Sequence, residues 1–157
     1  MKITDLECYS LLIPDFDADA CSSAQDNLIV KIHTDEGLIG IGETDTNPWG
    51  VKAIIDSPGT HAMGRGFKEL LVGKDPRNVE GLWHEMNEKT MMTTRRGLGI
   101  CAIGAIDMAL WDLCGKIYSQ PTWKLLGGSV KKEITPYASL LPEGRTLKDY
   151  SDSLVKN

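Results

Sequence analysis

Aspartates alternate in the segment from Asp15 to Asp26, where Asp15, Asp17 and Asp19 occupy every second position. Carboxylate oxygens at this spacing are the hard ligands that calcium prefers, as in the loop of an EF-hand. The glycine and the closing bidentate glutamate of that loop are missing, so we predict no metal site here. The segment has no helical or strand periodicity, and it therefore predicts a long loop of the kind that often carries function.

The histidines and cysteines form no pattern typical of a metal site or a nucleophile. His33, His61 and His84 fall in separate predicted elements. The four cysteines, at positions 8, 21, 101 and 114, lack both C-x-x-C spacing and the density of a disulfide scaffold. This cysteine usage, together with an N-terminus without an apolar signal-peptide core, predicts a protein of the reducing cytoplasm.

The composition is that of an ordinary globular domain. Of the 157 residues, 41% are hydrophobic and 25% are charged, and the formal net charge is -5. A net negative charge argues against nonspecific nucleic-acid binding, which needs a basic face for the phosphates. The length allows one domain with a proper core, or one domain plus a fragment.

The stretch from Leu98 to Ile117 is almost entirely apolar or small, and it predicts a helix at the centre of the fold. Apolar residues on more than one side indicate a helix that neighbours bury all round. A membrane span is the alternative, but Asp107, Asp112 and Lys116 would be costly in lipid. We predict a core helix and no membrane partner, with Asp112 and Lys116 paired along one face. We interpret Asp107 and Asp112 as structural anchors; a direct catalytic role is the alternative.

Three strands followed by helices are predicted before this central helix. The strands run from Lys2 to Ile13, from Asn27 to Thr34 and from Leu38 to Glu43, and Gly37 supplies the turn between the last two. Alternation in the first strand predicts Leu6, Cys8 and Leu12 on one face. Helices are predicted to start at Pro48 after an Asn47 cap, around Met63 to Leu71, and at Asp75-Pro76. The fold class is therefore α+β, with a three-stranded antiparallel meander followed by a helical bundle.

The pattern changes after Gly128. Glu133 to Leu141 predicts a short strand, and Thr146 opens a helical segment. A strand and then a helix make the first step of a β/α repeat. We predict two units, residues 1–128 and residues 129–157.

The central segment also carries a family resemblance. Its motif consists of Ala102-Ile103-Gly104-Ala105-Ile106-Asp107, Ala109-Leu110, Asp112-Leu113, Gly115-Lys116, Pro121 and Leu125-Leu126-Gly127. This run resembles the signature helix of the mandelate racemase/muconate lactonizing enzyme family of the enolase superfamily. Thr122 departs from the aliphatic residue usual in the family. The resemblance implies an enolase-like N-terminal capping domain over residues 1–128. Residues 129–157 would be the first strand and the start of the first helix of a TIM-type barrel, in a chain that looks truncated.

The resemblance implies a Mg²⁺-dependent lyase or isomerase that removes the proton α to a carboxylate. Such a proton is weakly acidic, so a metal held by oxygen ligands must meet the second negative charge. The family takes its metal ligands and its base from later barrel strands, so we assign no catalytic and no metal residue to this sequence. We expect the chain alone to be inactive, and the complete enzyme to be a homo-oligomer. Dehydration of a sugar acid is favoured over racemisation or cycloisomerisation.

What this domain can contribute is the cover over the active site. Two segments match the family's cap loops by position, Asp15 to Asp26 and Thr44 to Trp49. Candidate substrate-binding residues in them are Asp19, Cys21, Ser22 and Trp49; Tyr137 and Ser139 are weaker candidates. The alternative is that both segments are ordinary variable surface loops.

A second hypothesis comes from another functional class. The short chain would be a noncatalytic binding or oligomerisation module that pairs the strand predicted at 133–141 with another copy. An exposed strand edge and exposed apolar side chains favour such association.

Overall fold

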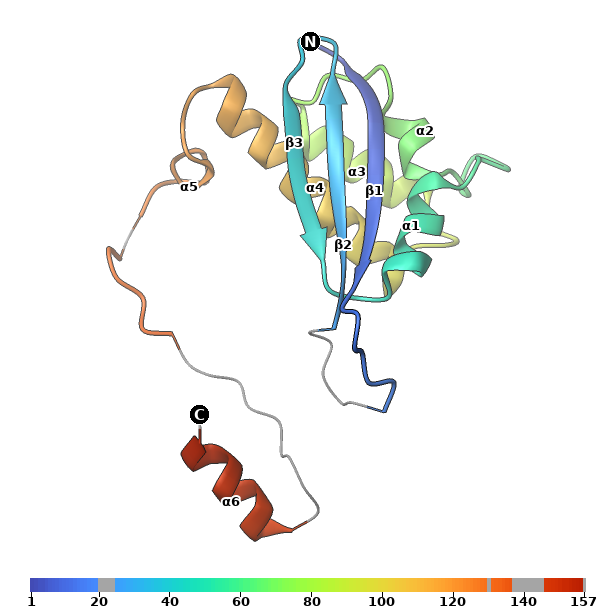
Figure 1. The fold of residues 1–157 in the computed structure, drawn as a ribbon. Helices are drawn as coiled ribbons and strands as arrows, with labels where there is room; N and C mark the ends of the chain where they lie inside the picture. The colour runs from blue at the N-terminus through green and yellow to red at the C-terminus, as the bar shows by residue number, and fades with distance from the viewer. Residues whose placement is uncertain (20–24, 130, 137–145, 157) are drawn as a thin grey trace.

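A computed structural model describes residues 1–19, 25–129, 131–136 and 146–156. The elements, in order, are β1 (Ile3–Leu12), β2 (Asp26–Thr34), β3 (Ile39–Thr44), α1 (Pro48–Asp56), α2 (Phe67–Leu71), α3 (Val79–Lys89), α4 (Leu98–Ile117), α5 (Thr122–Leu125) and α6 (Leu147–Lys156). A three-stranded antiparallel sheet lies against a layer of helices (Figure 1). The predicted α+β class and the meander are confirmed.

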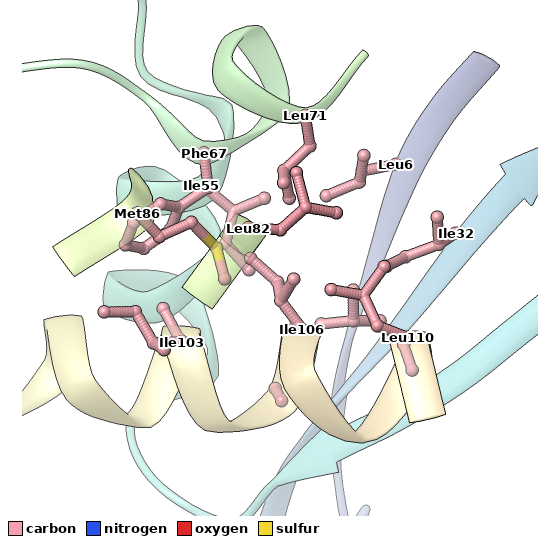
Figure 2. Close-up of a cluster of buried hydrophobic side chains, with 14 of the residues drawn as sticks. Leu6, Ile32, Ile55, Phe67, Leu71, Leu82, Met86, Ile103, Ile106 and Leu110 are labelled. Carbon is pink, nitrogen blue, oxygen red and sulfur yellow. The ribbon is translucent and has the colours of Figure 1, made fainter. Parts of the chain in front are cut away.

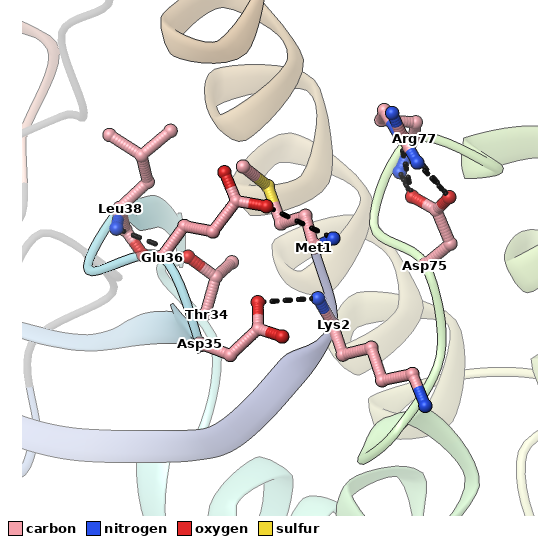
Figure 3. Close-up of polar contacts among 8 residues, drawn as sticks. All are labelled: Met1, Lys2, Thr34, Asp35, Glu36, Leu38, Asp75 and Arg77. Carbon is pink, nitrogen blue, oxygen red and sulfur yellow. Dashed lines mark hydrogen bonds and ion pairs between the residues drawn. The ribbon is translucent and has the colours of Figure 1, made fainter.

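The sheet has the order β1-β2-β3, so each strand pairs with its neighbour in sequence. The turn between β2 and β3 depends on Gly37, whose φ of 81° suits glycine. The Thr34 hydroxyl accepts a hydrogen bond from the Leu38 N–H at 3.1 Å and donates one to the Leu38 carbonyl at 2.9 Å. The Lys2 N–H reaches the Asp35 carboxylate at 2.7 Å, which ties the start of β1 to this turn (Figure 3).

One face of the sheet forms the core with the helices. Strand alternation places Leu28, Val30 and Ile32 of β2 on this face, each with no exposed surface. Figure 2 shows how Ile106 and Leu110 of α4 meet side chains from the sheet and from α2 and α3. The residue predicted at the end of the β1 apolar face, Leu12, is instead exposed.

Helix α4 packs directly on β3 because the facing residues are small. A Cβ added at Gly40 would overlap the Ala109 carbonyl oxygen, and one at Gly42 would overlap that of Ala105. Glycine in the strand and alanine in the helix therefore bring the two backbones together. This contact fixes the position of α4 across the sheet.

Charged side chains form hydrogen bonds with backbone groups along the outer edges of β1 and β3. Asp112 of α4 accepts a hydrogen bond from the Ile41 N–H at 2.8 Å, and Lys116 donates to the Ile39 carbonyl at 2.6 Å. The two side chains also pair with each other at 2.6 Å, which confirms the predicted Asp112–Lys116 pair. They join the end of α4 to the backbone of β3.

The β1 edge carries a similar set of contacts. The Lys52 ammonium donates to the Cys8 carbonyl at 3.1 Å, and the Asp5 carboxylate accepts from the Leu6 N–H at 2.9 Å. Both charges have an ion partner: Asp56 lies 2.9 Å from Lys52, and Lys68 lies 2.6 Å from Asp5. Hydrogen bonding to Lys68 lowers the pKa of Asp5.

The prediction that neighbours bury α4 all round is wrong for the described residues. Ile100 is 42% exposed and Met108 is 47% exposed, so one apolar stripe of the helix faces outward. The helix is long and apolar enough to span a membrane, but 56% of its most apolar 18-residue stretch is buried inside the fold. Its contacts with β3 make it a core helix, as predicted.

Of the three helix starts predicted before α4, the structure confirms one and places the other two later in the sequence. The Asn47 side chain accepts a hydrogen bond from the Gly50 N–H at 2.9 Å, which confirms the predicted cap of α1. Met63 lies outside α2, which begins only at Phe67. Asp75 does not open α3, which begins at Val79; its carboxylate instead pairs with the Arg77 guanidinium at 2.6 Å (Figure 3).

The end of the chain matches the prediction only in part. Residues 133–136 form no strand, so the strand predicted from Glu133 to Leu141 is wrong there, and its remainder lies outside the described residues. Helix α6 follows as predicted. The Thr146 hydroxyl accepts a hydrogen bond from the Asp149 N–H at 3.1 Å, and the Asp149 carboxylate accepts from the Thr146 N–H at 3.0 Å.

Candidate functional site

The antiparallel register brings the two predicted cap segments to one end of the sheet. Leu12 at the end of β1 pairs with Asp26 at the start of β2. Leu28 of β2 pairs with Thr44 at the end of β3. The segment after β1, the residues before β2 and the segment after β3 therefore start from neighbouring positions.

A pocket of about 450 Å³ lies between these segments. It is lined by Leu12, Phe16, Asp17, Ala18, Gln25, Asp26, Asp45, Thr46, Asn47 and Trp49. Phe16 is 51% exposed and Trp49 is 56% exposed, so their rings are available for contact with another molecule. Aromatic faces of this kind can pack against the apolar parts of a ligand.

The Gln25 side chain fixes the first wall of the pocket. Its amide oxygen accepts a hydrogen bond from the Asp17 N–H at 2.6 Å, and its amide nitrogen donates to the Asp17 carbonyl at 2.8 Å. The Gln25 backbone carbonyl also accepts from the Ile13 N–H at 2.9 Å. One residue next to β2 thus holds the backbone that follows β1.

Asn47 fixes the second wall. Its φ of 29° is positive, a region where asparagine is tolerated better than most residues. From this position its side chain caps α1, whose second residue is Trp49. The cap therefore sets where the Trp49 ring leaves the first turn of the helix.

The charge of the pocket is of one sign. Asp17, Asp26 and Asp45 contribute carboxylates, and none of the described residues that line it is lysine, arginine or histidine. Carboxylates accept hydrogen bonds and so suit hydroxyl groups of a ligand. The described lining offers aromatic faces and hydrogen-bond acceptors, which suit the binding of a ligand.

The structure places the sequence-predicted site residues unevenly. Trp49 lines the pocket, whereas Asp19 is exposed beside it, with its N–H bonded to the Asp17 carboxylate at 2.9 Å. Cys21 and Ser22 lie outside the described residues, as do Tyr137 and Ser139.

Sequence reasoning missed individual residues of the pocket, although most lie in the two predicted segments. Gln25 carried no motif, because its role depends on reaching the Asp17 backbone across the loop. Leu12, predicted on the apolar face of its strand, lines the pocket instead. The strand register was the one usable signal, since it places the three strand ends together.

The described residues do not fit a magnesium site. No group of three or more histidine, cysteine, aspartate or glutamate side chains among them is arranged to hold a metal ion. Asp15 is not part of the pocket lining, so the alternating aspartates of the sequence do not act together there. We derive no chemical step through a metal from these residues.

A second pocket, of about 530 Å³, lies along the β1 edge. It contains the Asp5–Lys68 and Lys52–Asp56 ion pairs and the Cys8 residue. Burial raises the pKa of the Cys8 thiol to about 11, so this cysteine is a poor nucleophile near neutral pH. We assign this pocket no chemistry.

Comparison with known proteins identifies relatives over most of the chain. Residues 14–127 match the profile described as mandelate racemase/muconate lactonizing enzyme, N-terminal domain. An L-rhamnonate dehydratase from Saccharopolyspora erythraea is 33% identical over 112 residues, which are 71% of this chain and 26% of that protein. The chain thus spans about a quarter of the length of this curated relative.

Solved structures give the same picture. The 3,6-anhydro-D-galactonate cycloisomerase from Zobellia galactanivorans is 35% identical with a TM-score of 0.66, covering 82% of this chain and 32% of that one. A mandelate racemase/muconate lactonizing protein from Paracoccus denitrificans PD1222, complexed with magnesium, is 25% identical with a TM-score of 0.65. The alignment covers 83% of this chain and 31% of that structure.

Proposed function

The chain belongs to the mandelate racemase/muconate lactonizing enzyme family, whose N-terminal domain it carries, and from this premise we propose that it is the capping domain of an enzyme acting on a sugar acid. Its role is to select the substrate, while the reacting groups come from another part of a longer protein. The observation that carries the proposal is the convergence of the two cap segments on one pocket with aromatic and polar walls.

The reaction class is inferred from the family and from the activities for which the relatives are named. The family resemblance implies removal of the proton α to a carboxylate. The relative named L-rhamnonate dehydratase favours dehydration of a sugar acid over racemisation or cycloisomerisation. Mg²⁺, present with the Paracoccus denitrificans relative, would supply the positive charge that a dianionic intermediate requires. Its ligands would lie outside residues 1–157, as the family resemblance implies; among the described residues no group of three or more histidine, cysteine, aspartate or glutamate side chains is arranged to hold a metal ion.

This chain's own residues would position the substrate and exclude water from it. Closing a site strengthens electrostatic interactions inside it, because the local dielectric constant falls. Gln25 and Asn47 would hold the two walls, and Phe16 and Trp49 would contact the substrate. Asp19, Cys21 and Ser22 remain candidate contacts from the first segment.

The outward stripe of α4 would be covered in the complete enzyme. Ile100 and Met108 are exposed there, and Trp123 of α5 and the adjoining Leu126 are exposed as well. Burying such side chains against a second domain is favourable. We propose that a barrel domain, of which residues 129–157 would be the first unit, packs on the capping domain.

Turnover measurements test the proposal. The purified 17.2 kDa chain should not convert sugar acids in the presence of Mg²⁺. Residues 1–128, fused to the part of the Saccharopolyspora erythraea dehydratase that follows its own matching segment, should restore dehydration. Turnover by the isolated chain, verified as pure by mass spectrometry, would contradict the proposal, and so would a folded fusion that is inactive on every sugar acid while the parent dehydratase is active.

Self-association is the second candidate function, favoured by the exposed apolar stripe of α4. The predicted orphan strand, which first suggested it, is not formed at residues 133–136. Light scattering after size exclusion separates the cases: a defined oligomer of the isolated chain supports a module for assembly, and a monomer supports a cap that needs its barrel. We expect the complete enzyme to be a homo-oligomer in the cytoplasm.

A further inference from the structure

The face of the sheet that points away from the core is unusually apolar. Figure 1 shows α3 and α4 behind the sheet, so that its other face is turned toward the viewer. An antiparallel sheet with one face in water normally carries polar side chains at its outward positions. Here those positions also hold large apolar side chains, which are exposed or half-buried: Tyr9, Leu11, Ile29, Ile39 and Ile41.

The strand register joins three of these side chains into a band across the sheet. Tyr9 of β1 is paired with Ile29 of β2. Ile29 is paired in turn with Glu43 of β3, and Ile41 is the next outward residue along that strand, diagonal to Ile29. Paired and diagonal neighbours on one face of a sheet lie within reach of one another. A continuous apolar band of this kind is typical of a protein interface.

Lys31 projects from the same face and has no carboxylate partner among the described residues. Its ammonium lies 4.8 Å from the centroid of the Tyr9 ring. Glu7 is paired with Lys31 across the strands, but other groups occupy its carboxylate. That carboxylate accepts a hydrogen bond from the Tyr9 hydroxyl at 2.8 Å and lies 2.9 Å from a ring nitrogen of His33. The positive charge of Lys31 is therefore available to another molecule.

Glu43 is the complementary group on this face. It is exposed, and its carboxylate accepts a hydrogen bond from the Asn27 side-chain amide at 2.7 Å. In the part of the chain that the structure describes, no cation forms an ion pair with it. A face with one available cation and one available carboxylate complements itself under two-fold symmetry, because each group then meets the other group of the partner.

We propose that two copies of this chain associate through the outward faces of their sheets. The two apolar bands cover each other, and Lys31 of each copy lies against the partner's Glu43. A purely apolar partner would leave both charges buried without a counterion, and this favours a second copy as the occupant. The inference goes beyond the proposed function and does not depend on it, since this face is separate from the lining of the cap pocket and from the outward stripe of α4.

Analytical ultracentrifugation of the purified chain tests the proposal. We expect a species of twice 17.2 kDa in equilibrium with the monomer. Ile41→Lys should raise the dissociation constant about tenfold or more, because the interface would bury an ammonium group without a partner. Met108→Lys on α4 is the matched control and should leave the constant unchanged, since Met108 and Ile41 are both 47% exposed.

A charge exchange tests the pairing itself. Lys31→Glu and Glu43→Lys should each raise the dissociation constant about tenfold, because each places like charges opposite each other. The double variant restores opposite charges in reversed order and should return the constant to within about threefold of the original value. Circular dichroism confirms that each variant is folded.

Each alternative has its own result. A monomer at every concentration, or a dimer that the sheet variants leave intact, overturns the inference. A monomer whose Ile41→Lys change instead lowers the melting temperature of the fusion enzyme assigns the face to the rest of the same protein. A double variant that fails to associate overturns the Lys31–Glu43 pairing, and with it the choice of a second copy.

The α4 control also separates this dimer from the second candidate function. A dimer that Met108→Lys dissociates forms through the α4 stripe and supports the assembly module. A dimer that only the sheet variants dissociate supports the inference, and it does not count for that module because the α4 stripe stays free for a barrel domain. Turnover by the fusion enzyme tests the capping role separately, so the two proposals can fail independently.

Discussion

Gln25 gives the loop after β1 a partner that a backbone strand would otherwise provide. Its side-chain amide accepts a hydrogen bond from the Asp17 N–H at 2.6 Å and donates one to the Asp17 carbonyl at 2.8 Å, as a paired residue of a neighbouring strand would. The Gln25 side chain, next to the start of β2, thereby holds the part of the loop that forms the pocket wall. Any ligand that touches Phe16 or Asp17 depends on this contact.

Gln25→Ala should loosen that wall without unfolding the domain. Two hydrogen bonds near the surface are lost, for a cost of about 1–2 kcal/mol in the free energy of unfolding. Hydrogen exchange at the Asp17 amide should become faster, while exchange at Val30 in the middle of β2 stays slow. Gln25→Glu keeps an acceptor for the Asp17 N–H and should restore part of the protection. Unchanged exchange at Asp17 in the alanine variant would show that the amide does not hold the loop.

The Asp75–Arg77 pair should contribute to stability in a way that depends on pH. Its hydrogen bonds to Arg77 lower the pKa of Asp75 from 3.8 to about 2. A carboxyl whose pKa is lower in the folded state stabilises the fold above its unfolded pKa, and this stability is lost as pH falls from about 4 to about 2. Because the pair is exposed and screened by solvent, we expect less than about 1 kcal/mol.

Thermal unfolding of Asp75→Asn checks this expectation. Asparagine keeps an oxygen that can accept from the Arg77 N–H, so the variant removes mainly the charge. It should melt below the original protein at pH 7, and the difference should shrink toward pH 2. A difference in melting temperature that stays constant over this range would contradict the assignment.

At the scale of elements, the contact between β3 and α4 organises the domain. The predicted sheet and central helix gave no direct indication of how closely they approach. Gly40 and Gly42 of β3 have no side chains, and the backbone carbonyls of Ala109 and Ala105 in α4 occupy the positions where their Cβ atoms would be. The two alanines of α4 favour the helix and also leave room for the strand backbone.

Gly42→Ala should be strongly destabilising for this reason. Its Cβ would overlap the Ala105 carbonyl oxygen, and backbone atoms cannot move aside as a flexible side chain can. We expect a loss of about 3 kcal/mol or more in chemical denaturation. Gly104→Ala on α4 is the control, since nothing lies within 4 Å of an added Cβ and the helix gains about 0.5–1 kcal/mol from propensity. Equal effects of the two substitutions would refute the close approach.

Periodicity predicted the strands and the long helix well, because alternation and the i, i+4 rule follow directly from backbone geometry. It failed where a third element decides the outcome. The outward position of Ile100 and Met108 depends on which sides of α4 have neighbours, and the start of α2 depends on Gly66 and on the contacts before it. The Asp112–Lys116 pair was predictable from spacing, but its bonds to β3 were not.

At the scale of the whole molecule, the core ends well before the described chain does. Leu125 is the last described residue that packs on the hydrophobic cluster. Beyond it Ile134 is 84% exposed and Leu147 is 88% exposed. These exposures agree with the boundary predicted at residue 128, which stays a prediction.

Removing residues 129–157 should leave that unit folded. We expect the melting temperature of residues 1–128 to lie within about 2 °C of that of the full chain, because no described core contact is lost. Differential scanning calorimetry provides the comparison. A drop of more than about 5 °C, or loss of the cooperative transition, would place residues 129–157 within the capping unit and move the domain boundary.

The candidate site shows the same limits of prediction at this scale. The two cap segments were found by position, and antiparallel pairing brings their ends together in space. The polarity of the pocket was not predicted, because it arises only when Asp17 and Asp26 meet Asp45 from the other segment. Side chains distant in sequence combine their charges only after the chain has folded.

Charged side chains occupy backbone groups along the two outer strands of the sheet, and this affects whether a second copy of the protein can pair with them. The side chains are Asp112, Lys116, Asp5 and Lys52. A foreign strand would have to displace ammonium and carboxylate groups from the Ile41 N–H and the Ile39, Leu6 and Cys8 backbone before it could pair there. These contacts therefore disfavour strand-by-strand addition of further copies at the two edges of the sheet, although the apolar stripe of α4 stays exposed.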